Sequence, residues 1–123
     1  MNTPQMVKRR VAEIRGRQAE DDVAAIWSAR GFDILARRLR TKSGEIDLII
    51  ANTETLIFVE VKSRSTLAEA AYSVVPRQQR RLLEAADLVL AEHTDWHRPS
   101  TRFDVALVCN GRIEHIEDAI RYH

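Results

Sequence analysis

The sequence has a single cysteine, no apolar run of membrane-spanning length and no apolar stretch at its amino terminus. Cys109 therefore has no partner within the chain for a disulfide, and it cannot form a cysteine-based zinc site. A bilayer-spanning helix needs about 20 apolar residues, and a signal peptide needs an apolar segment after its basic start. We expect a cytoplasmic protein that makes no contact with a membrane.

Lysine is also scarce, with three lysines beside 16 arginines. Arginine presents a planar fork of donors that suits phosphate, so this composition is compatible with a nucleic-acid partner. A GC-rich genome would produce the same bias. The net charge of +1 shows no overall polycation. Composition therefore does not decide the partner.

Repeats, low-complexity tracts and linkers are absent from the 123 residues, of which 45% are apolar and 30% charged. This length and composition predict one soluble globular domain, 1–123, with a single modest core.

Hydrophobic periodicity predicts helices at 7–29 and 76–93, the second beginning at a proline. Strands are expected at 34–39, 46–51 and 56–63. A hairpin over 102–116 would turn at Asn110–Gly111. The segment 66–75 reads as a loop or a short helix, and 93–101 as a loop. The order predicts an α/β fold with a central mixed sheet flanked by helices.

One acid falls on the apolar side of the first helix. Residues placed about 100° apart bring Glu20 onto the same arc as the apolar positions. These positions are Gly16, Ala19, Val23, Ala24, Ile26 and Trp27. Glu20 is therefore expected to face the sheet.

Three charged residues interrupt the two most apolar strands, in "GEIDLII" and "LIFVEVKS". Alternation along a strand puts Glu60 and Lys62 on one face with Phe58. It also puts Asp47 on the side of Ile49, opposite to Ile46, Leu48 and Ile50. If the two strands are neighbours, Asp47 and Glu60 lie on the same side of the sheet.

Two adjacent carboxylates repel each other unless a cation or a proton lies between them. Mg²⁺ suits such a pair because it takes one or two protein carboxylates, keeps several waters and accepts phosphate oxygens. Lys62 could contact a water or a phosphate there, which suits hydrolysis of a phosphodiester. The alternative is a solvent-exposed ladder of salt bridges. Against it, the intervening Ile49 and Phe58 are apolar.

Three other charged features have simpler interpretations. His93 and His97 in "HTDWH" lack the glutamate of the zinc-protease helix motif and fit a loop with surface histidines. Asp104 in "RFDV" is expected to be the structural partner of an arginine rather than a catalytic acid. Arg77, Arg80 and Arg81 lie on the polar face of the second helix, either as solvated surface or as phosphate contacts.

Several sequence words together resemble the YraN-type family of small bacterial proteins. They are "GRQAEDDVAAIWSARGFDILARRLR", "SGEIDLI", "FVEVKSR" and "RFDVALV", and the resemblance runs from about Gly16 to Ala119. Asp47, followed after 12 residues by Glu60-Val61-Lys62, is similar to the PD-(D/E)XK signature of the restriction-endonuclease-like superfamily. Within it, the arrangement resembles archaeal Holliday-junction resolvases.

The resemblance implies a restriction-endonuclease-like three-layer core and a Mg²⁺- or Mn²⁺-dependent nuclease acting on DNA, branched DNA included. It implies catalytic roles for Glu20, Asp47, Glu60 and Lys62, with Asp47, Glu60 and the Val61 carbonyl as metal ligands. The role of Glu45, in the word "GEID", is left open between a ligand and a turn contact.

Candidate nucleic-acid contacts are Arg64, Arg77, Gln78 and Arg81. The sequence departs from the family at Gln78, where lysine is usual, and at Arg38, where asparagine is frequent. A binding module without catalysis remains the alternative. DNA or RNA, duplex or junction, and monomer or homodimer are left open.

Overall fold

The computed structural model describes residues 3–72 and 74–121. Its elements are, in chain order, α1 (Pro4–Ala29), β1 (Asp33–Thr41), β2 (Gly44–Ala51), β3 (Thr55–Ser63), α2 (Leu67–Tyr72), α3 (Pro76–Glu92), a 3₁₀ turn η1 (Thr94–Trp96), β4 (Ser100–Cys109) and β5 (Arg112–Ile116). The predicted helices and strands are thus confirmed, with ends that differ by a few residues.

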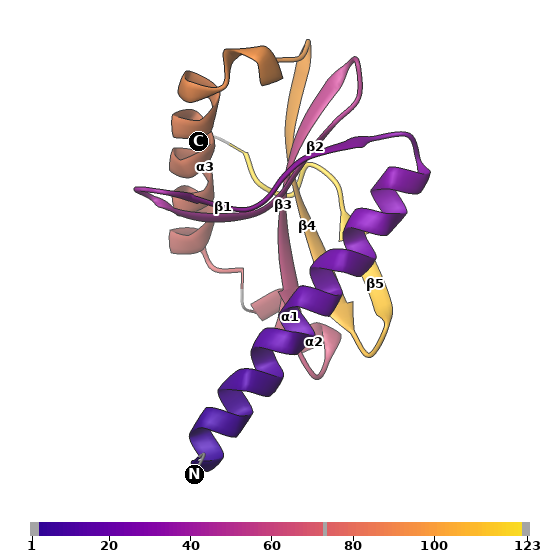
Figure 1. The fold of residues 1–123 in the computed structure, drawn as a ribbon, viewed down its shortest axis with the longest axis vertical. Helices are drawn as coiled ribbons and strands as arrows, with labels where there is room; N and C mark the ends of the chain where they lie inside the picture. The colour runs from indigo at the N-terminus through magenta and orange to yellow at the C-terminus, as the bar shows by residue number, and fades with distance from the viewer. Residues whose placement is uncertain (1–2, 73, 122–123) are drawn as a thin grey trace.

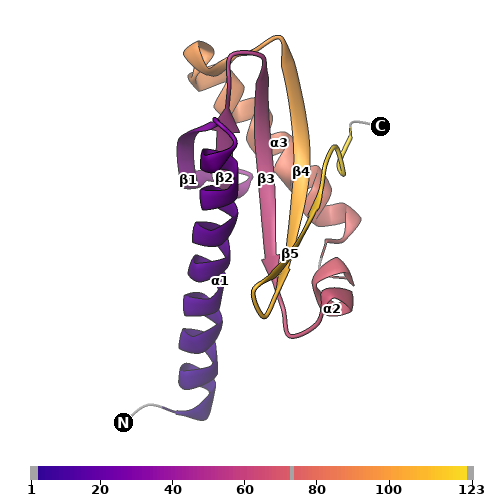
Figure 2. The ribbon, with the colours of Figure 1, turned by 90° about the vertical axis from the view of Figure 1, so that its right-hand side faces the viewer.

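The five strands form one mixed sheet in the order β1-β2-β3-β4-β5. β3 and β4 are parallel, whereas the other neighbouring pairs are antiparallel. A parallel pair needs a long crossover, and here α2 and α3 provide it. Figures 1 and 2 show α1 on one face of the sheet and α3 on the other. The predicted α/β architecture with a central mixed sheet is confirmed.

Each face of the sheet has its own hydrophobic cluster, because the side chains of a central strand alternate between two covered faces. Ile57, Val59 and Val61 of β3 pack with Val23 and Trp27 of α1. Glu20 is buried on the same side of α1, as predicted, but Ile26 is 36% exposed, so its place in the buried arc is wrong.

The opposite face of β3 carries Phe58, whose ring stacks on Phe103 of β4. This cluster includes the apolar side of α3, with Leu82 and Val89, and Ala70 of α2. Both faces of β3 are therefore dry along the middle of the strand, and the charged residues appear only toward its carboxyl end.

Two connections are more regular than a loop. In 66–75, the helical alternative is confirmed over α2, Leu67–Tyr72, whereas Ser73 lies outside the described residues. In 93–101 the expected loop is wrong in part, since η1 forms at Thr94–Trp96 and β4 already begins at Ser100. The Asn110–Gly111 turn has φ of 47° and 80°, the positive values of a type I′ hairpin. No helix among the described residues is long and apolar enough to cross a bilayer.

Candidate active site

The candidate site lies where β2 separates from β3. Their pairing ends at Leu48 and Val59, one position before Asp47 would face Glu60. The Asp47 carboxylate instead accepts a hydrogen bond from the backbone N–H of Val61, at 2.8 Å. A side chain thus replaces a backbone partner, and it stands in the gap that opens between the two strands.

The separation of the strands also changes the face that β2 presents. Ile46 packs in the cluster of Ile49, not in that of Leu48 and Ile50. The expected grouping of Ile46 with Leu48 is therefore wrong. Strict alternation fails because β2 twists away from β3 beyond Leu48 while it stays paired with β1.

Glu60 and Lys62 form an ion pair at the end of β3. Their oxygen and nitrogen lie 3.0 Å apart, and the side chains are only 10% and 13% exposed. A pair this dry interacts more strongly than one in water, and its removal from solvent also costs more. This burial overturns the alternative of a solvent-exposed ladder, since Asp47 too is largely covered.

The electrostatic balance at Asp47 is unfavourable to its charge. Burial, then the neighbouring carboxylate of Glu60 and, more weakly, that of Glu20 raise its pKa to about 7. The Val61 N–H and the Lys62 ammonium oppose this shift. Asp47 and Glu60 are therefore close enough to repel each other, and a proton or a cation would stabilise the pair.

Glu20 reaches the site from α1 and is held by an arginine. Both of its carboxylate oxygens accept from the Nε of Arg38, at 2.7 and 3.0 Å. Arg38 has a φ of 50°, in the left-handed region that non-glycine residues seldom occupy. Asparagine tolerates that region better than arginine, which agrees with its frequent occurrence at this position in the family. Here the arginine ties β1 to α1 beside Asp47.

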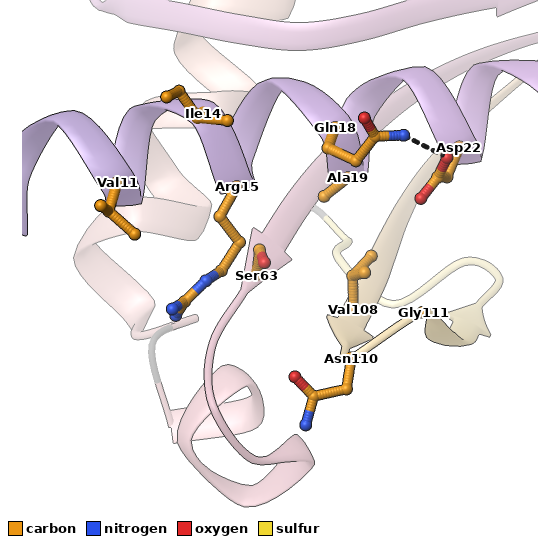
Figure 3. A pocket seen from close by; sticks show the side chains of 10 residues that line it. All are labelled: Val11, Ile14, Arg15, Gln18, Ala19, Asp22, Ser63, Val108, Asn110 and Gly111. Carbon is orange, nitrogen blue, oxygen red and sulfur yellow. Dashed lines mark hydrogen bonds between the residues drawn. The ribbon is translucent and has the colours of Figure 1, made fainter.

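A pocket of about 410 Å³ opens beside Asp47. We call it the Asp47 pocket, and it is lined by Ala12, Arg15, Gly16, Asp47, Val61, Lys62, Ser63 and Arg64. A second pocket of about 330 Å³ shares Arg15 and Ser63 with it and extends to Asn110. Figure 3 shows this second pocket, with Arg15 extending from α1 past Ser63.

The donors at this site fit a magnesium-like cation better than zinc. No group of three or more His, Cys, Asp or Glu side chains in the described part of the chain is placed to hold a metal. Mg²⁺ needs only one or two carboxylates and fills its other positions with water and phosphate oxygens. Asp47, whose pKa is raised in part by the neighbouring Glu60, and Glu60 itself supply that number of carboxylates.

The model of the uncharacterised protein family UPF0102 matches residues 19–108. The chain belongs to the UPF0102 family. A UPF0102 protein of Acidiphilium cryptum is 54% identical over 113 residues, which cover 92% of this chain and 88% of the relative. A UPF0102 protein of Azorhizobium caulinodans is 46% identical over 119 residues, covering 96% and 91%. The YraN-type assignment made from the sequence words is the same family, and it is confirmed.

The matched region contains Glu20, Asp47, Glu60 and Lys62, and the structure brings these four together. Arg64 also lies at the site, as part of the Asp47 pocket. The three predicted contacts on α3, Arg77, Gln78 and Arg81, do not line that pocket. Arg81 packs against Gly44 at the tip of the β1–β2 hairpin instead.

Two residues of the site were not found from the sequence. Arg15 is an exposed arginine on a helix rich in them, and nothing in the pattern separates it from its neighbours. Arg38 could have been suspected, because an arginine in place of asparagine ahead of "GEID" calls for a carboxylate partner. The partner, Glu20, is 18 residues away along the chain and could not be inferred from spacing.

Outside the site, Asp104 has the structural role expected of it, whereas His93 is half-buried rather than a surface histidine. Asp104 is fully buried and accepts from Arg102 at 2.9 and 3.1 Å and from the backbone of Asp118, and its other contact is His115 at 2.9 Å. Burial tends to raise its pKa, but these hydrogen bonds hold that pKa below its ordinary value. His93 stacks on Trp96, and His97 bonds the Leu90 carbonyl. The structural interpretation of Asp104 is confirmed.

Proposed function

We propose that this protein is a divalent-cation-dependent nuclease that hydrolyses phosphodiester bonds in DNA, branched DNA included. The observation that carries the proposal is the meeting of the Asp47 and Glu60 carboxylates with Lys62 at the branch between β2 and β3. Together with the spacing of these residues, it supports membership of the restriction-endonuclease-like superfamily.

Each residue has a task in this reaction. Asp47, Glu60 and the Val61 carbonyl would hold Mg²⁺ or Mn²⁺, which supplies positive charge to a phosphoryl oxygen and makes water a better nucleophile. Lys62 places an ammonium group beside the attacked phosphate, where it stabilises the negative charge that develops. The Val61 N–H fixes the rotamer of Asp47, so that the pair is organised before substrate arrives.

Arginines at the rim of the Asp47 pocket would bind the substrate. Arg15 and Arg64 stand there with Lys62, so the rim offers three cations to a phosphate backbone. Arginine suits this role because its fork can donate two hydrogen bonds to one phosphate.

One contact favours the second candidate, a nucleic-acid-binding module without turnover. Arg38 occupies both oxygens of Glu20, so the acid that α1 brings to the site is already engaged. A scaffold that had given up catalysis would tolerate such a contact, whereas a catalytic Glu20 must exchange it for substrate or water.

The deciding experiment is a cleavage screen of purified protein on plasmid, single-stranded, flap and four-way-junction DNA, with Mg²⁺ and with Mn²⁺. Wild type is expected to cut at least one substrate, and Asp47→Asn to cut none. Asp95→Asn, an exposed acid away from the site, is the matched control and should cut like wild type. Wild type that binds DNA but leaves every substrate intact with both metals would establish the binding module.

A further inference from the structure

The charge of this protein is concentrated at one end of α1. Residues 1–17 contain Lys8, Arg9, Arg10, Arg15 and Arg17 against the single acid Glu13, a net charge of +4. Because the whole chain has a net charge of +1, residues 18–123 together carry −3. A nearly neutral protein thus has a strongly basic segment.

This segment projects beyond the sheet. Figures 1 and 2 show the amino-terminal half of α1 extending past the ends of the strands, and residues 3–15 are all exposed. We call residues 4–17 the α1 overhang. At 1.5 Å per residue it is about 20 Å long, enough to follow about six nucleotides of a strand. Nothing in the described residues covers the charges along this length.

The overhang leads into the Asp47 pocket. Gly16 and Ala12 lie about one and two turns before Ala19, on the helix side that packs on the sheet. Where the sheet ends, these small residues leave space above Asp47, and a Cβ added to Gly16 would meet nothing within 4 Å. Arg15 stands at the edge of this space.

We propose that the α1 overhang is a nucleic-acid-binding arm, which holds the phosphate backbone and guides a strand across the Asp47 pocket. The inference rests on the proposed function for the substrate class. Its own basis is the charge, the exposure and the continuity with the pocket.

A second copy of the chain is a less suitable occupant. Val7, Val11 and Ile14 form an apolar stripe along the overhang, and their exposed fractions are 48%, 50% and 61%. Two overhangs packed through this stripe would bring two segments of +4 together and repel each other. A polyanion neutralises the same charge and releases counterions, so charge complementarity favours nucleic acid.

The test compares two variants that lose the same charge. Lys8→Gln/Arg9→Gln/Arg10→Gln removes three positive charges from the overhang, and Arg30→Gln/Arg40→Gln/Arg121→Gln removes three from exposed arginines elsewhere. Glutamine is a good helix former and the lost charges lie near a positive helix end, so α1 should stay helical by circular dichroism. Binding of a fluorescent 30-base-pair duplex and of a four-way junction is measured in EDTA across a KCl series.

For B-DNA each phosphate contact contributes about 0.9 to the slope of log K against log salt. The overhang variant should therefore lower the slope by about two to three units and weaken binding by at least tenfold at about 0.1 M salt. The control variant should change the slope by less than about one unit. Equal slopes for the two variants, or no binding by wild type, would overturn the proposal.

Sedimentation of wild type and of Val11→Ser/Ile14→Ser tests the other occupant. If wild type sediments as a monomer, the result supports the overhang as a nucleic-acid-binding arm. A wild-type dimer that this variant dissociates, together with an unchanged salt slope in the overhang variant, would assign the overhang to self-association. Because binding is measured without metal, an arm that binds DNA stands even if no cleavage is found. Conversely, if wild type cleaves DNA but the overhang variant has an unchanged salt slope, the proposed arm would be wrong while the proposed nuclease function would stand.

Discussion

The Asp47 carboxylate accepts the backbone N–H of Val61 across 2.8 Å, in the gap between two strands that have just stopped pairing. This bond favours the charged carboxylate, whereas burial and Glu60 favour the protonated one. A single side chain therefore links the geometry of the sheet to the protonation of the site, and stability, metal binding and activity should all respond to it.

Stability should fall with rising pH in the absence of metal. The pKa of Asp47 is about 7 in the folded protein against an ordinary 3.8, so the folded state binds the extra proton. The proton on Asp47 contributes fully to the free energy of unfolding below about pH 4, and this contribution is lost as the pH rises to about 7. At about 1.4 kcal/mol per pH unit, the loss amounts to up to about 4 kcal/mol. Urea unfolding in EDTA at pH 4.5 and 7.5 measures it.

Asp47→Asn should flatten this dependence, because asparagine does not titrate. Asp33→Asn, an exposed acid, should keep the wild-type slope. A wild-type protein whose stability rises over the same interval would show that Asp47 is charged throughout and that the carboxylates do not repel.

At a pH above 7, Mg²⁺ or Mn²⁺ should raise the melting temperature of the protein, because a ligand that binds only the folded state stabilises it by mass action. The stabilisation is about 2.7 kcal/mol when the ligand concentration is 100 times its Kd. Asp47→Asn/Glu60→Gln should lose this response, and Asp47→Asn alone, which keeps the Glu60–Lys62 ion pair, should be at least as stable as wild type without metal. The exposed pair Glu54→Gln/Asp95→Asn should keep the response. Identical melting curves of wild type with and without metal would argue against a cation at this site.

Lys62→Ala should lower the cleavage rate by about 10²–10³ while DNA affinity changes little, since one preorganised charge acts mainly on the transition state. Lys42→Ala, at an exposed lysine, should cleave at the wild-type rate. The metal-dependent rise in melting temperature should persist in Lys62→Ala, which separates lost chemistry from lost metal. A variant that cuts as well as wild type would remove Lys62 from the reaction.

Asp104→Ala should destabilise the fold by about 3–5 kcal/mol, because it leaves Arg102 without its buried carboxylate partner and His115 without its contact. Glu117→Ala removes a second, exposed partner of the same Arg102, at 3.7 Å, and should cost less than about 1 kcal/mol. Chemical denaturation of both variants gives the comparison. Equal costs would mean that the buried network contributes no more than a surface ion pair.

The two long helices, α1 and α3, and the β4–β5 turn could be predicted because local chemistry determines them. Pro76 begins α3, and Asn110–Gly111 adopts the positive φ values that its residues favour. The proximity of Asp47, Glu60 and Lys62 followed from strand alternation and one assumption, that β2 and β3 are neighbours. That assumption is correct up to Leu48.

The separation of β2 from β3 could not be predicted. Strand periodicity carries no sign that β2 leaves β3 beyond Leu48, so Ile46 was placed in the wrong cluster. The positive φ of Arg38 could not be predicted either, because arginine has no local preference for that conformation and its partner Glu20 is remote along the chain. The sequence also does not predict that residues 4–17 extend beyond the sheet, since the spacing of Val7, Val11 and Ile14 is that of a helix with one covered side.

The contact between Gly44 and Arg81 has a practical consequence for work with this chain. Gly44 has a φ of 133°, and any Cβ there would lie 2.9 Å from the Nε of Arg81. The tip of the β1–β2 hairpin therefore lies against the Arg81 side chain of α3. An epitope tag or fluorophore inserted there would displace this contact, three residues from Asp47. The β2–β3 loop, with exposed Thr53 and Glu54, is the safer point of attachment.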